Sequence, residues 1–143
     1  MQPAVIEPAV IERWHRLVER NDMAALDELL ADDAVFQSPI VHTPQAGKAI
    51  TAKYLMGAAS ILNNASFRYV NEWYGERSAV LEFEAVVDGI QVNGVDMIAW
   101  NDDERIVRFK VMVRPLKAIH LLHQKMAALL TAAAPTATGA AAP

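Results

Sequence analysis

One acidic residue, Asp96, lies among apolar neighbours in the segment 92–100. The alternation of this segment predicts a strand, and it places Asp96 on the same side as the apolar residues. A carboxylate in an apolar interior must be paired, protonated or functional. Asp96 is therefore a candidate general acid or base, or a donor to a ligand carbonyl when it is protonated. The alternative is a structural carboxylate that hydrogen-bonds Trp14, Tyr54 or a backbone amide and fixes the wall of a pocket.

The four histidines offer further chemistry. His42 lies in a polar loop and is a candidate base near neutral pH, although a solvated loop histidine is the more common situation. His120 and His123 are three residues apart on a predicted helix, but their helical neighbours supply no third ligand, so no metal site is predicted. His15 is expected to face water. The chain has no phosphate-binding glycine loop, nucleophilic serine motif or dinucleotide fingerprint, so no organic cofactor is required.

Charged residues alternate with apolar residues on two predicted strands, with Glu82 and Glu84 on one and Arg108, Lys110 and Arg114 on the other. If the apolar residues face the interior, the charged residues share the outer face of a sheet. There they can pair across strands and set the register of a dimer. The alternative is a catalytic carboxylate or an anion-binding arginine.

Composition limits the function classes. The chain has 143 residues, no cysteine and a formal net charge of −4. A negative net charge provides no general attraction for nucleic acid or for an anionic membrane. No apolar run is long enough to span a bilayer, and the N-terminus lacks the pattern of a secretion signal. We therefore expect one cytoplasmic domain over residues 1–131, a disordered tail rich in alanine, threonine and proline over 132–143, and no nucleic-acid or membrane partner.

The elements that must position these residues follow from hydrophobic periodicity. In chain order they are a helix from about Pro8 to Arg20, a short helix from Met23 to Asp32-Asp33, a brief strand over 34–38, a helix over 48–62, four strands over 67–73, 79–87, 91–100 and 106–114, and a last helix after Pro115. Asp88-Gly89 is the strongest hairpin signal. Helices followed by an antiparallel meander predict an α+β fold, with the helices against one face of a curved sheet.

The order of these elements, with the segments AALDELLADDAVFQSP (24–39) and GVDMIAWNDDERIVRFKVMVRP (94–115) and with Gly47 before a helix, resembles the nuclear transport factor 2-like superfamily. The SnoaL-like and ketosteroid-isomerase-like branches are the most similar. The resemblance implies a cone-shaped roll, in which a strongly curved, mostly antiparallel sheet and N-terminal helices enclose an apolar pocket, commonly in a dimer packed through the sheets. Members include isomerases, cyclases, epoxide hydrolases and non-catalytic binding domains, so the fold does not choose among them.

The ketosteroid isomerases in this superfamily use an aspartate before a proline as the general base, and Ser38 has that place here. Their oxyanion hole combines a tyrosine of the first helix with a protonated aspartic acid on a later strand. Trp14 matches the tyrosine and Asp96 matches the acid, while Leu55 stands where a further tyrosine is often found. Because Ser38 and Trp14 replace two of the three groups, the chain is not expected to be a ketosteroid isomerase.

The residues predicted to line the apolar pocket are Trp14, Phe36, Ser38, Tyr54, Leu55, Phe83, Ile98, Trp100, Phe109 and Val111. The alternative is that their aromatic side chains fill an ordinary core. Three functions stay open at this point. The first is the binding of a small apolar molecule. The second is an isomerase, lyase or hydrolase that acts on a polyketide- or terpenoid-like metabolite, with Asp96 and His42 as the candidate acid and base. The third is a purely structural homodimer, packed through the sheet face.

Overall fold

The computed structural model describes residues 6–133, which contain four α-helices and six strands. They are, in order, α1 (Ala9–Arg20), the 3-10 helix η1 (Met23–Ala25), α2 (Leu26–Leu29), β1 (Leu30–Gln37), β2 (Gln45–Ala46), α3 (Lys48–Leu62), β3 (Arg68–Tyr74), β4 (Ser78–Val87), β5 (Ile90–Trp100), β6 (Ile106–Arg114) and α4 (Leu116–Ala133). None of these helices is long and apolar enough to cross a membrane.

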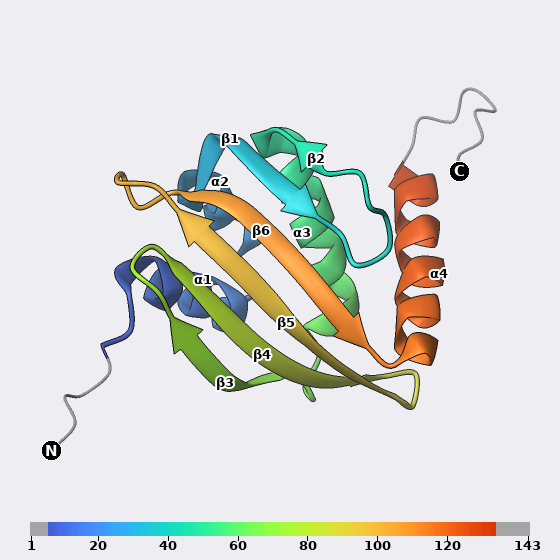
Figure 1. The fold of residues 1–143 in the computed structure, drawn as a ribbon. Coiled ribbons are helices and arrows are strands. Elements are labelled where there is room, and N and C mark those ends of the chain that lie inside the picture. Colours follow the sequence, from blue (N-terminus) through green and yellow to red (C-terminus); the bar gives the residue numbers. More distant parts are fainter. Residues whose placement is uncertain (1–5, 134–143) are drawn as a thin grey trace, which may run out of the picture.

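The six strands form one sheet in the order β2-β1-β6-β5-β4-β3. Neighbouring strands are antiparallel except for β1 and β6, which are parallel. The sheet is strongly curved; α1, α2 and α3 lie behind it in Figure 1, and α4 stands beside α3 at one edge. The predicted α+β roll, with helices against one face of a curved and mostly antiparallel sheet, is therefore confirmed.

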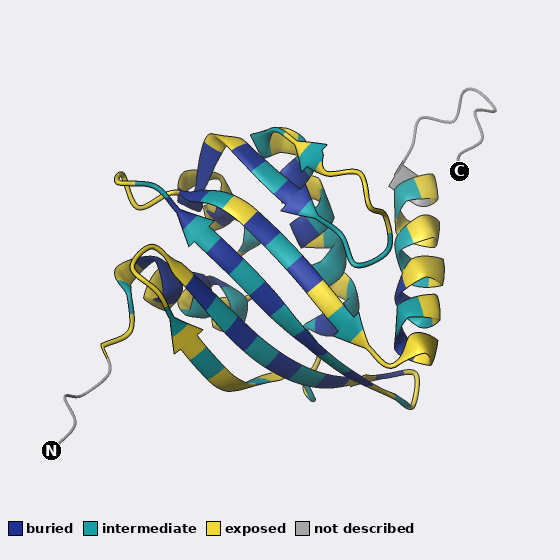
Figure 2. Cartoon of the chain, in the orientation of Figure 1, coloured by how far each residue is buried: buried dark blue, intermediate teal, exposed yellow. Residues whose placement is uncertain are grey.

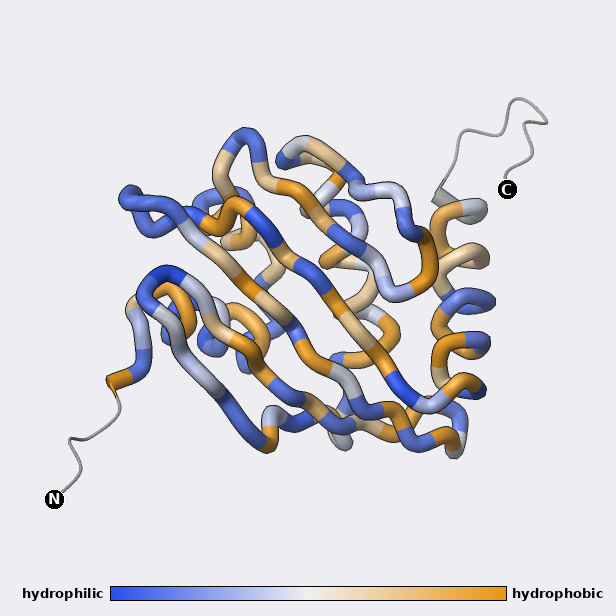
Figure 3. Tube along the Cα trace, in the orientation of Figure 1, coloured by the Kyte–Doolittle hydropathy of each residue, from blue (hydrophilic) through white to orange (hydrophobic). Residues whose placement is uncertain are grey.

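The central strands alternate between a buried face and a more exposed face, as Figures 2 and 3 show for burial and hydropathy. On β5 every second residue from Val92 to Trp100 is buried, and Asp96 is among them. The inward residues pack against the helices, because strand side chains alternate with period two and only one face is covered. The predicted inward position of Asp96 is thus correct.

The outer face of the sheet carries polar pairs across strands, but the partners of Glu82 and Glu84 lie on β3 and β5. The predicted partners Arg108, Lys110 and Arg114 are on β6, which β5 separates from β4. Arg68 on β3 contacts Glu84 on β4 at 2.9 Å, between the nitrogen and oxygen atoms. The side-chain amides of Asn71 and Asn93 donate hydrogen bonds to Glu82 from the two flanking strands. These hydrogen bonds lower the pKa of Glu82, since they stabilise its charged form.

Two predicted boundaries are wrong at the start of the sheet. The second helix ends at Leu29, and β1 begins at Leu30 instead of after Asp32-Asp33. The pairing of β1 with β6 shifts register between Leu30 and Val35, so the two aspartates bulge outward while their neighbours stay buried. Strand β2 was not predicted, because a strand of two residues has no periodicity to detect.

The remaining boundaries agree closely with prediction. Helix α3 spans 48–62 as predicted, and the turn after β4 has positive φ at both Asp88 (50°) and Gly89 (78°), as a tight hairpin requires. The last helix continues to Ala133, two residues into the range predicted as tail. The rest of that range lies outside the described residues, so the tail and the single-domain boundary stay predictions.

Candidate functional site

A chain of three side chains connects α1 to the middle of the sheet. Tyr69 on β3 donates its hydroxyl hydrogen to Oδ2 of Asp96 at 2.6 Å, and the indole N–H of Trp14 donates to the Tyr69 oxygen at 2.9 Å. Asp96 is only 7% exposed and sits on β5 between Leu81 of β4 and Val111 of β6. Asp96 is therefore a buried carboxyl group that is held by one strong donor.

Burial dominates the electrostatics of Asp96. It raises the pKa of the carboxyl group from 3.8 to about 7, while the hydrogen bond from Tyr69 and the nearby His15 partly oppose this rise. The pKa of Tyr69 lies well above 10, because burial and the neighbouring Asp96 both disfavour a phenolate. Near neutral pH, Asp96 can therefore take up or release a proton, whereas Tyr69 remains a neutral hydrogen-bond donor.

A cavity of about 60 Å³ borders Asp96, and its wall is almost entirely apolar. It lies between the sheet and helices α1 and α3, with Trp14, Leu55, Phe83 and Phe109 in its lining. This volume is well below the roughly 300 Å³ typical of small-molecule sites. Most of the aromatic residues that were predicted to line a pocket therefore pack against one another. The Trp14 and Phe109 rings, for example, have their centroids 4.9 Å apart.

A second apolar cavity, of about 160 Å³, lies under α4. Phe36, Ser38 and Tyr54 line it together with residues of α4. Three residues, Ala58, Leu62 and Val111, line both cavities and so separate them. The residues predicted to form one pocket are thus divided between two cavities.

Two predicted pocket residues line neither cavity. Ile98 and Trp100 are 1% and 8% exposed, and both belong to the hydrophobic core. They share the inward face of β5 with Asp96, but they lie further along the strand toward the β5–β6 turn. The inward-facing positions of Ile98 and Trp100 therefore led to burial, but not to contact with either cavity.

Ser38 and His42 do not meet Asp96 in a common site. The Ser38 hydroxyl oxygen accepts hydrogen bonds from the backbone N–H groups of Ile40 (2.9 Å) and Val41 (3.4 Å), so it closes the turn after β1. His42 is exposed in the following loop and lines neither of the two cavities. The structure therefore provides no acid and base pair formed by Asp96 and His42.

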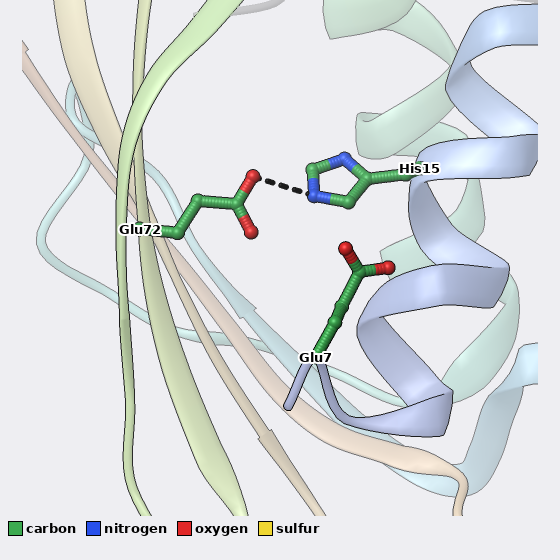
Figure 4. A group of neighbouring side chains, drawn as sticks. All are labelled: Glu7, His15 and Glu72. Atoms are coloured by element: carbon green, nitrogen blue, oxygen red, sulfur yellow. Dashed lines mark ion pairs between the residues drawn. The ribbon is translucent and has the colours of Figure 1, made fainter. Parts of the chain in front are cut away.

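The sequence interpretation missed Tyr69 and was wrong about His15. The His15 imidazole is only 17% exposed and its Nε2 lies 2.7 Å from Oε2 of Glu72 on β3, because α1 packs against the inner side of that strand (Figure 4). The ring of Tyr69 stands edge-on to His15, with 5.0 Å between centroids. The sequence places Tyr69 on the same predicted strand as Phe67 and Trp73. This position alone does not indicate which residue the Tyr69 hydroxyl contacts.

Residues 11–109 match the family model of the SnoaL-like domain. A steroid delta-isomerase from Pseudomonas aeruginosa has a similar structure, with a TM-score of 0.83 and 38% sequence identity, over 87% of this chain and 90% of that one. An uncharacterised protein with a cystatin-like fold from Silicibacter pomeroyi DSS-3 has a TM-score of 0.81 and 27% identity, over 87% of each chain. The epoxide hydrolase/cyclase-like enzyme SalBIII shares the fold alone, with a TM-score of 0.60 and 16% identity over 73% of this chain and 88% of that one. A comparison with curated proteins gave no match.

Proposed function

The chain belongs to the SnoaL-like domain family, and from this premise we propose that it binds a small, largely apolar molecule whose single polar oxygen contacts Asp96. The observation that carries this proposal is the buried Asp96 carboxyl group, which Tyr69 holds at the wall of an apolar cavity. Oδ1 of Asp96 has no hydrogen-bond partner among residues 6–133, so it is available to a ligand. A protonated carboxyl group would donate to a carbonyl oxygen, and an ionised one would accept from a hydroxyl group.

The size of the cavities limits the ligand. The volume beside Asp96 holds only a few heavy atoms, and the larger volume under α4 is separated from it by Ala58, Leu62 and Val111. A longer molecule would have to displace these shared side chains to reach the volume under α4. We therefore propose a ligand with its polar end at Asp96 and an apolar part that extends toward α4.

Proton transfer by Asp96 is the second candidate function, and the pKa of about 7 favours it. A group with this pKa exchanges protons readily near neutral pH, as a general acid or base must. Similarity to a steroid delta-isomerase supports an isomerase-type reaction, although lyase and hydrolase chemistry on an apolar metabolite fit the same group. Asp96 is the only carboxyl group among the described residues that line its cavity, so it would both remove and return the proton.

Native mass spectrometry of freshly purified protein tests the binding proposal. We expect the wild-type chain to release a discrete apolar compound on denaturation, and we expect Asp96→Leu to lose it, because the polar anchor is gone. Asp103→Leu, in the exposed turn after β5, is the matched control and should retain the compound. A wild-type protein without any bound compound, or equal retention by both variants, would contradict the proposal.

The outer sheet face is proposed to pack against a second copy of the chain. Apolar side chains there are unusually exposed, with Trp73 at 56% and Met112 at 49%, and no helix of the described part covers this face (Figure 1). We expect sedimentation velocity to show a dimer at micromolar concentration and Met112→Glu to shift it toward monomer, since a charge would be buried. A monomeric wild-type protein would contradict this packing.

The cytoplasmic location, the lack of nucleic-acid and membrane partners and the lack of an organic cofactor stay predictions from the sequence.

A further inference from the structure

Three potential metal ligands converge beside the Trp14–Tyr69–Asp96 chain. They are Glu7, which precedes α1, His15 in α1 and Glu72 on β3. Their donor atoms all lie within 4.8 Å of one another, and both carboxylates face the His15 imidazole in Figure 4. The three side chains also line a groove between α1 and β3.

The charges in this cluster are not balanced by basic residues. Among the described residues Glu72 forms an ion pair only with His15, and no ion pair includes Glu7. Arg68 also lines the groove, but its guanidinium contacts Glu84. Two carboxylates thus stand next to an imidazole with no lysine or arginine against them, and this surplus of negative charge favours a bound cation.

The His15 nitrogen is itself unusual. Nε2 is buried and makes no hydrogen bond of acceptable geometry, although it lies 2.7 Å from a Glu72 oxygen. A buried polar atom without a hydrogen bond is rare and calls for an explanation such as an ion or a water molecule. A metal ion placed between the two atoms would bind both the nitrogen lone pair and the carboxylate oxygen.

We propose that Glu7, His15 and Glu72 bind one divalent transition-metal ion, of which Zn²⁺ is the representative. Zinc binds imidazole nitrogen and carboxylate oxygen at roughly 2.0–2.2 Å, which places tetrahedral ligand atoms roughly 3.3–3.6 Å apart. The His15 and Glu72 atoms, which lie 2.7 Å apart, must therefore separate by roughly 0.6–0.9 Å, which a small rotation of either side chain provides. Glu7 is exposed and is free to turn toward the same ion. Mixed nitrogen and oxygen ligands favour Zn²⁺, Co²⁺ or Mn²⁺ over Ca²⁺, which takes oxygen ligands.

The surroundings of Glu72 suit a ligand role. The Tyr74 hydroxyl donates to Oε1 of Glu72 at 2.7 Å, which leaves Oε2 as the oxygen that faces His15. Hydrogen bonds of this kind orient the ligands of metal sites and tune their affinity. Because three protein ligands leave one tetrahedral position open, water from the groove would complete the site. This proposal departs from the sequence prediction of no metal site, which considered only His120 and His123.

The test is Zn²⁺ binding to tag-free, chelator-stripped protein, by isothermal titration calorimetry with Co²⁺ absorption as a second readout. We expect one ion per chain. Glu72→Gln keeps the shape of the side chain and should weaken binding by more than about 100-fold, and Tyr74→Phe should weaken it about 10- to 100-fold. His15→Gln should behave like Glu72→Gln. The matched control removes the exposed histidines of α4, through His120→Ala and His123→Ala, and should leave the affinity unchanged.

Circular dichroism of the metal-free variants establishes that each one is folded. The proposal is overturned if folded wild-type protein binds no stoichiometric Zn²⁺, if binding survives both Glu72→Gln and His15→Gln, or if it is lost in the α4 variants instead. None of these results bears on ligand binding at Asp96, which Asp96→Leu tests separately.

Discussion

Replacing Asp96 with asparagine is expected to stabilise the folded protein at pH 8. The gain in the free energy of unfolding should be up to about 4 kcal/mol larger at pH 8 than at pH 4. The reason is that the wild-type carboxyl group must ionise in an apolar site at high pH. Asparagine is nearly the same shape, stays neutral, and can still accept the hydrogen bond from Tyr69. Urea denaturation of both proteins across this pH range measures the effect.

The sign follows from where each state releases its proton. Unfolded Asp96 loses its proton near pH 3.8, whereas folded Asp96 keeps it to about pH 7. Between these values the folded state binds more protons, so the free energy of unfolding of the wild-type protein falls as the pH rises. Below pH 3.8 the group makes no difference, and above about pH 7 its full destabilising effect is reached. Asp96→Asn removes this pH dependence.

The matched control for this prediction is Asp33→Asn. Asp33 is an exposed aspartate on β1, so the same chemical change there should alter stability by no more than about 0.5 kcal/mol at either pH. A parallel pH dependence in the wild-type and Asp96→Asn proteins would show that Asp96 ionises normally, and proton transfer by this residue would then lose its support. If Asp96 does transfer protons, the stabilised variant should be inactive, since asparagine cannot take up or release a proton near neutral pH.

Replacing Tyr69 with phenylalanine is expected to lower the free energy of unfolding by about 1–3 kcal/mol. The change removes one hydroxyl group that accepts from Trp14 and donates to Asp96. The Trp14 N–H is then left buried without a partner, and the Asp96 carboxylate loses its donor. Because the lost hydrogen bond stabilised the charged form, the pKa of Asp96 should rise further. Urea denaturation gives the first effect, and carbon-13 NMR titration of the Asp96 carboxyl group gives the second.

Tyr54→Phe provides the control for the tyrosine change. Tyr54 is half-buried and stacks on Phe36, but its hydroxyl group makes no hydrogen bond within the described residues. Its loss should change stability by no more than about 0.5 kcal/mol and leave the pKa of Asp96 in place. An Asp96 pKa that does not move in Tyr69→Phe would mean that the tyrosine only fills space there.

The two variants also distinguish roles in the proposed site. Asp96 would contact the ligand, whereas Tyr69 would act through Asp96 by holding its position and its protonation state. Trp14 stands one step further away, because its N–H is bonded to Tyr69 and not to Asp96. The resemblance to ketosteroid isomerases matched Trp14 to the tyrosine of their oxyanion hole. In this structure, however, its indole N–H already donates a hydrogen bond to Tyr69.

Local patterns in the sequence were sufficient for the elements and for the side of the sheet that each residue faces. Period-two alternation placed Asp96 inside, and the Asp88-Gly89 pair marked the hairpin between β4 and β5. Both depend on neighbours within a few residues, so they are present in the sequence itself. The same holds for α3, whose spacing and flanking residues predicted its limits.

Contacts between distant residues were decided only by the tertiary structure. Trp14 and Tyr69 are 55 positions apart, and Tyr69 and Asp96 are 27 apart. Their meeting depends on the register of β3 against β4, which shifts between Tyr69 and Asn71, and on the docking of α1 against the inner side of β3. Bulges and helix docking result from the packing of the whole core and leave no local periodicity. For the same reason, the sequence predicted that His15 would face water, whereas folding brought it to Glu72.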